Sequence, residues 1–139
     1  MTEAALDDYV AALARKLRLK PPLATLALNA PAEYVAALRA ALGSAAVREN
    51  ADGAMYDLVS LFARSRAEIE ASAPAAIAAT RAGGQLWIMW PKKTARVSSD
   101  LSRDSLAALL TLLGWEPVAS IAVDDTWSAL RFKPLANGD

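Results

Sequence analysis

Residues 56–68 have the sequence YDLVSLFARSRAE, which combines the signals of a strand and of a helix. The first part, residues 56–63, is a nearly continuous apolar run, as is typical of a strand buried on both faces. Ser65 and Glu68 then have the S-x-x-E spacing of a capping box, which opens a helix. A strand followed directly by a helix is the unit from which α/β proteins are built.

The same order of strand and helix recurs on both sides of this unit. The expected strands, from apolar runs and turn signals, are 23–29, 45–50, 56–63, 85–90, 117–124 and 126–133. The expected helices are 4–18, Pro31 to Gly43, Ser65 towards Thr80 with a kink or restart at Pro74, and 98–114. The last two strands are separated by hairpin spacing.

Apolar strands that alternate with longer helices predict a mostly parallel sheet covered on both faces. We therefore expect an α/β protein: a single three-layer α/β/α sandwich whose mostly parallel sheet is closed by an antiparallel C-terminal hairpin, as in Rossmann-like folds. One domain is expected over residues 1–135, and residues 136–139 are expected to form a frayed tail.

The composition excludes several kinds of chemistry. The 139 residues contain no cysteine and no histidine, which removes thiolate nucleophiles, the serine–histidine triad and most transition-metal sites. The 15 basic and 15 acidic residues cancel, so no overall field favours nucleic acid or an anionic membrane. No apolar run approaches the roughly 18 residues of a membrane helix. Because the start is acidic and lacks an export signal, we expect a cytoplasmic protein.

Polar residues follow the carboxyl ends of the predicted strands. These ends lie at one edge of a parallel sheet, where ligands bind, and the final hairpin turn reaches the same edge. The candidate ligand-binding residues are therefore Asn29, Arg64, Ser65, Lys92, Lys93, Arg96, Asp124, Asp125 and Trp127. The lysines and Arg96 would supply positive charge from the polar loop 92–100. Ser65 opens a helix, whose free backbone N–H groups favour an anion.

The segment LWIMW, residues 86–90, has a structural interpretation. Successive strand residues point to opposite faces, so Trp87 and Trp90 are expected to be core residues on opposite faces of the sheet. Pro91 would end the strand, and the peptide bond between Trp90 and Pro91 is a candidate for the cis form.

The candidates of the final hairpin also have structural interpretations. Asp124 and Asp125 suit a turn without any ligand, because aspartate side chains bond to nearby backbone N–H groups. Arg131 shares a strand face with Trp127 and would stack on it as a cation–π pair.

Three segments carry a resemblance to a known family. They are GGQLWIMWPKK (83–93), DLSRDSLAALLTLLGW (100–115) and AVDDTWSALRF (122–132). Together they resemble a bacterial family of small proteins labelled domain of unknown function 3052, over residues 55–133, and KLRLKPPLATLALNAPAEY (16–34) resembles the start of that family. The resemblance supports the fold and implies no activity. Ala119 and Ile121 stand where members often have lysine and cysteine.

The predicted strand order also looks like that of a reduced S-adenosylmethionine-dependent methyltransferase. Such a cofactor site normally has a glycine-rich turn after the first strand, which lets the backbone approach the cofactor closely. Here that turn is NAPAEY, residues 29–34, without glycine. Glu49, after the expected second strand, would fill the role of the acidic residue that binds ribose hydroxyls.

Three functions remain open from the sequence. The preferred one is a non-catalytic domain without a cofactor that binds a small anionic ligand or a protein partner at the carboxyl edge, with Asp124 orienting the lysines. The first alternative is a degenerate or minimal S-adenosylmethionine-dependent transferase, with Lys92 or Asp124 as acid or base. The second alternative is a structural dimerisation module that uses alanine-rich helix faces. No metal site is expected.

Overall fold

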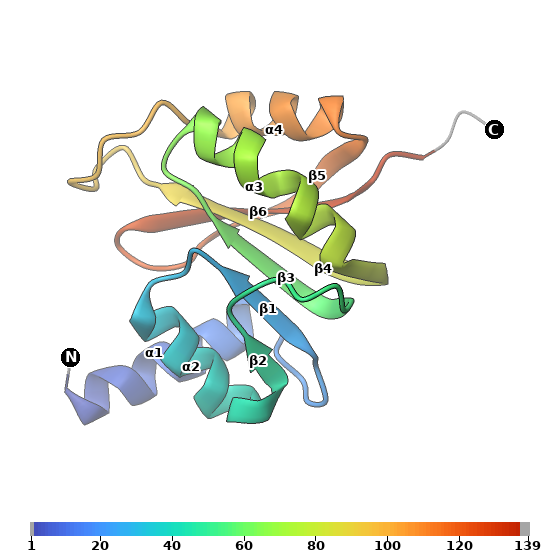
Figure 1. Ribbon diagram of the computed structural model, residues 1–139. Coiled ribbons are helices and arrows are strands. Elements are labelled where there is room, and N and C mark those ends of the chain that lie inside the picture. The colour runs from blue at the N-terminus through green and yellow to red at the C-terminus, as the bar shows by residue number, and fades with distance from the viewer. Residues whose placement is uncertain (1, 137–139) are drawn as a thin grey trace.

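The computed structural model describes residues 2–136, in which helices cover both faces of a six-stranded sheet (Figure 1). The helices are α1 (Glu3–Lys16), α2 (Ala32–Leu42), α3 (Arg66–Ala79) and α4 (Arg103–Leu112), with a 3-10 turn η1 (Ser44–Ala46). The strands are β1 (Thr25–Leu28), β2 (Val47–Arg48), β3 (Tyr56–Phe62), β4 (Thr80–Pro91), β5 (Trp115–Ala122) and β6 (Trp127–Pro134). In Figure 1, α3 and α4 lie above the sheet and α1 and α2 lie below it.

The strands lie in the order β2-β1-β3-β4-β6-β5. The first four pair in parallel, and β6 runs antiparallel between β4 and β5. The chain leaves β1 towards β2 on one side, whereas β3 pairs with β1 on the other side, so the direction of winding switches between β1 and β3. The predicted three-layer, Rossmann-like α/β fold with its antiparallel C-terminal hairpin is confirmed.

The tryptophan strand divides its side chains between two cores, as its alternation predicts. Trp87 packs in the cluster beneath α1 and α2, and is 4% exposed. Trp90 belongs to the cluster formed with α3 and α4, and is 7% exposed. Since β4 pairs with β3 on one side and β6 on the other, both tryptophans are structural residues of the inner sheet.

Some local expectations were wrong. The cis bond of the described residues joins Pro21 to Pro22, so the bond before Pro91 is trans. Pro91 is the last residue of β4, as expected, and it still pairs with Trp127 of β6. Helix α3 continues through Pro74 without a restart. The expected frayed tail falls, from residue 137 on, outside the described residues. None of the helices within residues 2–136 is long and apolar enough to cross a membrane.

Candidate functional site

The carboxyl edge of the sheet gathers the ends of β1, β3 and β4 together with the turn between β5 and β6. The amide of Lys92, directly after β4, donates to the Thr126 carbonyl in that turn at 2.8 Å. The hairpin turn is therefore fastened to the exit of β4. Most of the predicted site residues lie along this edge, in two groups that are described in turn.

The first group surrounds the switch point between β1 and β3. Asn29 directly follows β1 and has a φ of +56°, a left-handed conformation in which the chain turns as it often does at glycine. Pro31 then precedes α2 and provides no side-chain cap. The first intrahelical bonds of α2 run from the Tyr34 and Val35 amides to the Pro31 carbonyl. The amides of Ala32 and Glu33 are thus the free donors that a helix start presents.

Glu49 lies on the other side of β1 from β3. It directly follows β2, which pairs in parallel with β1 through Arg48 and Leu26. Its carboxylate is half exposed and forms a 3.4 Å ion pair with Arg39 of α2. An exposed pair of this kind contributes at most about 1 kcal/mol, so a ligand can replace Arg39 at small cost.

The start of α3 is already closed by side chains of the protein. The Ser65 hydroxyl oxygen accepts from the Glu68 amide at 3.1 Å, and Glu68 Oε2 accepts from the Arg64 amide at 3.2 Å. Asp100, from the loop that follows β4, accepts from the Arg66 amide at 2.8 Å. The sequence predicted an anion at this helix start, and the structure instead uses carboxylates of the chain itself.

Arg64 lies on a column of aromatic rings. Its guanidinium carbon is 5.3 Å from the Trp127 ring centroid. Phe62 contacts Trp127 edge-on at 4.9 Å and Tyr34 at 4.7 Å between centroids. The cation–π partner of Trp127 is therefore Arg64, which lies two residues after the end of β3, and not Arg131 as expected from the strand alternation. Trp127 is 5% exposed, so it serves as a support for Arg64.

Asp124 organises the hairpin turn. Its Oδ1 accepts from the amides of Thr126 and Trp127 at 2.8 and 2.9 Å. Its Oδ2 accepts from the Tyr9 hydroxyl of α1 at 3.3 Å, and burial together with the Asp124 charge raises the pKa of Tyr9. The turn interpretation thus describes Asp124 well, and these bonds do not reach the lysines that it was expected to orient. Asp125 is exposed in the same turn.

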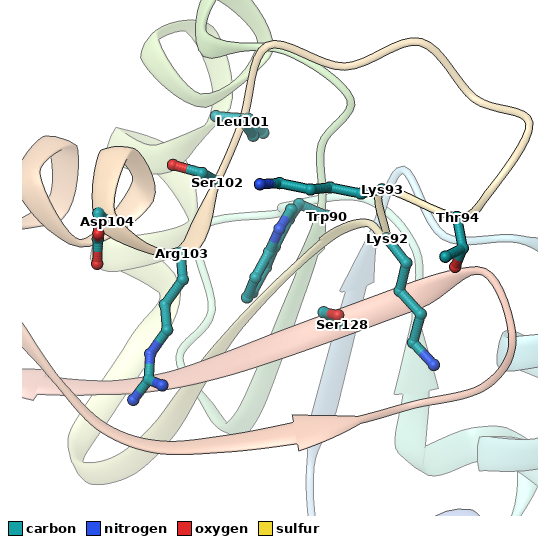
Figure 2. A pocket seen from close by; sticks show the side chains of 9 residues that line it. All are labelled: Trp90, Lys92, Lys93, Thr94, Leu101, Ser102, Arg103, Asp104 and Ser128. Atoms are coloured by element: carbon teal, nitrogen blue, oxygen red, sulfur yellow. The ribbon is translucent and has the colours of Figure 1, made fainter.

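The second group borders a cavity of about 500 Å³ beyond the end of β4 (Figure 2). Its lining residues are Trp90, Lys92, Lys93, Thr94, Leu101, Ser102, Arg103, Asp104 and Ser128. In Figure 2, Lys93 extends above the upper end of Trp90 towards Ser102, and Arg103 lies to the left of Trp90, whereas Lys92 points away from Trp90, down and to the right. Indole, hydroxyls and cations thus meet around one opening.

Sequence reasoning identified only the lysines of this cavity. Arg96 lies exposed in the loop and is not among the lining residues. Arg103 was missed, although the capping box of Ser102 and Ser105 fixes the start of α4 beside the loop. Ser128 was missed because its position follows from the register, in which it pairs with Trp90.

The chain was compared with known proteins. No family model matches it, and no curated protein sequence matches it. Solved structures do match. The DhpI-SAH complex is 17% identical with a TM-score of 0.56, and the alignment covers 98% of this chain and 89% of that chain.

Two further solved structures cover most of both chains. A methyltransferase from Geobacter sulfurreducens in complex with S-adenosyl-L-homocysteine is 10% identical with a TM-score of 0.59, and 91% of this chain and 90% of that chain are covered. The ribosomal protein L11 methylase from Lactobacillus delbrueckii subsp. bulgaricus is 9% identical with a TM-score of 0.61, at 95% and 80% coverage. At these identities the likeness shows the fold.

These matches correct three expectations. The likeness to domain of unknown function 3052 has no support from a family model, whereas the likeness to the methyltransferase fold is borne out. The preference for a non-catalytic binding protein was wrong, and so was the expectation of no cofactor. The solved structures that share this fold include methyltransferases, and several of the matching structures hold S-adenosylmethionine or S-adenosylhomocysteine. The first alternative, a minimal S-adenosylmethionine-dependent transferase, agrees better with them.

Proposed function

We propose that this protein binds S-adenosylmethionine at the carboxyl edge of its sheet and acts as a minimal methyltransferase. The observation that carries the proposal is the strand order β2-β1-β3-β4-β6-β5, with its switch point between β1 and β3. Ligands of open α/β sheets bind outside such a switch point. Solved structures that match 91% of this chain or more include complexes with S-adenosylhomocysteine.

The residues at the switch point fit the cofactor. Glu49 offers a half-exposed carboxylate beside β1, suited to accept hydrogen bonds from ribose hydroxyls. The amides of Ala32 and Glu33 at the start of α2 are suited to the carboxylate of the methionine portion, because the positive end of the helix dipole lies there. Asn29 supplies the left-handed turn that leads from β1 to the start of α2.

The turn also differs from a glycine-rich one. The Cβ atom of Ala30 and the ring of Pro31 take up space that glycine would leave open, and Pro31 has no N–H to donate. We therefore expect the cofactor to bind more weakly here than at a turn that contains glycines.

When bound, S-adenosylmethionine supplies an activated methyl group on a sulfonium centre. The chain would supply the binding site for the methyl acceptor. Neighbouring strands lie about 4.8 Å apart, so the ends of β1 and β4, with β3 between them, are about 10 Å apart. The cavity beside Trp90 is therefore near enough to hold an acceptor, with Lys93 and Arg103 as its cations. Asp124, one of the two residues expected as acid or base, is held in the hairpin turn by the Thr126 and Trp127 amides.

Isothermal titration calorimetry and thermal unfolding with S-adenosylmethionine and S-adenosylhomocysteine test the proposal directly. At ten times Kd, either ligand is expected to stabilise the protein by about 1.4 kcal/mol, or to raise Tm by about 5 °C. Loss of a hydrogen bond to a charged group costs about 1.5–3 kcal/mol, so Glu49→Gln should weaken binding at least tenfold.

Glu116→Gln is the matched control. Glu116 also forms a 3.4 Å surface ion pair, with Lys133, but it lies at the start of β5, away from the carboxyl edge. This variant should bind both ligands as the wild type does. The proposal fails if neither ligand binds the wild-type protein, or if the two glutamine variants weaken binding equally.

A further inference from the structure

A second, smaller cavity lies on the α1 face of the sheet, away from the carboxyl edge. Its volume is about 180 Å³, and it lies between the end of α1 and the strands β4, β5 and β6. Trp87 of β4, Arg131 of β6 and Ala119 of β5 are register partners across these three strands and all border it. Lys16, the last residue of α1, and Arg18, two residues beyond it, border the cavity on its other side.

The cavity concentrates positive charge. Lys16, Arg18 and Arg131 all line it, and no aspartate or glutamate is among its lining residues in the described part of the chain. The ion pairs found between residues 2 and 136 do not involve these three cations. Within a chain of zero formal net charge, this is a local excess that lacks a counter-charge.

Arg131 is the least expected of the three. The helix dipole favours cations near the end of α1, which accounts for Lys16 and Arg18. No such effect applies to Arg131, which continues the row of Trp127 and Ala129 on β6, where these residues are 5% and 0% exposed. Arg131 is itself partly buried. Keeping a guanidinium in such a place without a counter-ion is unfavourable, and a bound anion would remove that cost.

Neighbouring groups add hydrogen-bond donors. The Trp87 indole N–H donates to Gln85 Oε1 at 3.1 Å, which leaves the NH₂ of the Gln85 amide as its unused donor end. Lys16 Nζ donates to the Val123 carbonyl at 3.4 Å and retains further N–H groups. Cations and amide donors without acceptors are what an oxyanion requires.

We propose that this cavity binds a phosphate group. Its volume equals that of about six water molecules, which is enough for one tetrahedral oxyanion and too small for a nucleotide. The ligand is inorganic phosphate or the phosphoryl group of a small metabolite whose remainder extends out of the cavity. The site is separate from the proposed cofactor site, and it does not depend on methyl transfer.

Thermal unfolding at constant ionic strength tests this proposal. Sodium phosphate and glycerol 3-phosphate are titrated against sodium chloride of matched ionic strength. At ten times Kd, phosphate is expected to raise Tm by about 5 °C over chloride. A larger response to glycerol 3-phosphate than to phosphate would identify a phosphorylated metabolite as the source, and an equal response would identify free phosphate.

Three variants locate the effect. Arg131→Gln and Lys16→Gln each remove one charge from the cavity and should weaken phosphate binding tenfold or more. Arg15→Gln removes the same charge from the neighbouring, exposed position of α1 and should leave Kd within twofold. If Arg131→Gln does not fold, Lys16→Gln alone decides. The proposal is overturned if phosphate acts no differently from chloride, or if the cavity variants keep wild-type affinity.

Discussion

The buried hydrogen bond between Tyr34 and Ser60 should be worth a measurable part of the stability of this protein. The two oxygens are 2.7 Å apart, and both residues are 0% exposed. Tyr34 lies in the first turn of α2 and Ser60 lies in the middle of β3, so the bond joins the two elements beside the proposed cofactor site. Tyr34→Phe keeps the ring and removes only the hydroxyl.

The expected cost follows from burial. Tyr34→Phe leaves the buried Ser60 hydroxyl without a hydrogen-bond partner, which costs about 1–3 kcal/mol of stability. With an unfolding entropy of about 2.1 cal/mol/K per residue, 2 kcal/mol corresponds to a fall in Tm of about 7 °C for this chain. Ser60→Ala should cost a similar amount, because it leaves the Tyr34 hydroxyl unpaired instead.

A double-mutant cycle separates this bond from simple loss of packing. The variant that carries both Tyr34→Phe and Ser60→Ala has no unpaired hydroxyl, so it should be more stable than the sum of the single changes by about 1–3 kcal/mol. Urea unfolding followed by tryptophan fluorescence gives the free energies, provided that the m-value stays constant. Additive single changes would refute the reasoning.

Two further predictions concern the same region. Burial raises the pKa of Tyr34 above its ordinary value near 10. Above pH 10 the folded protein therefore keeps the phenol proton that the unfolded chain loses, and the free energy of unfolding should fall by up to about 1.4 kcal/mol per pH unit. The fall should be less steep in Tyr34→Phe. Equal slopes in urea unfolding between pH 10 and 11.5 would contradict this. The left-handed conformation of Asn29 predicts that Asn29→Ala costs about 1 kcal/mol more stability than Asn29→Gly. As a control, Asn50→Ala, at an exposed position without positive φ, should change the stability little. Equal stability of the two Asn29 variants would argue against the left-handed turn.

Local signals predicted most of the fold because each marks a physical requirement. The capping box at Ser65 supplied the start of α3, and apolar runs marked the strands that are buried on both faces. The start of β4 was missed because Gly83 and Gly84 are typical of a turn. Gly84 in fact lies against β3, where a Cβ atom would come within 3.0 Å of the Asp57 carbonyl oxygen, a close approach that no single-strand pattern reveals.

The candidate site was harder to predict, since its members meet only through tertiary contacts. The rule for strand ends led to the edge beside which the cavity at Trp90 lies, and it identified Lys92 and Lys93 among the lining residues of that cavity. It could not distinguish a free helix start from a closed one. The start of the helix at Ser65 appeared available, yet Glu68 accepts from the Arg64 amide and the distant Asp100 accepts from the Arg66 amide. Arg131 was expected to stack on Trp127, whereas Arg64 reaches that ring from the connection between β3 and α3.

The bond from Asp100 to the first turn of α3 has a consequence for ion competition. Asp100 is held beside the Arg66 amide by the chain itself, because the loop that carries it is anchored by β4 and α4. A tethered group of this kind has an effective concentration in the millimolar range or above. Dissolved phosphate or sulfate must outcompete it to reach this helix start. A response of the protein to low phosphate concentrations would therefore come from another part of its surface.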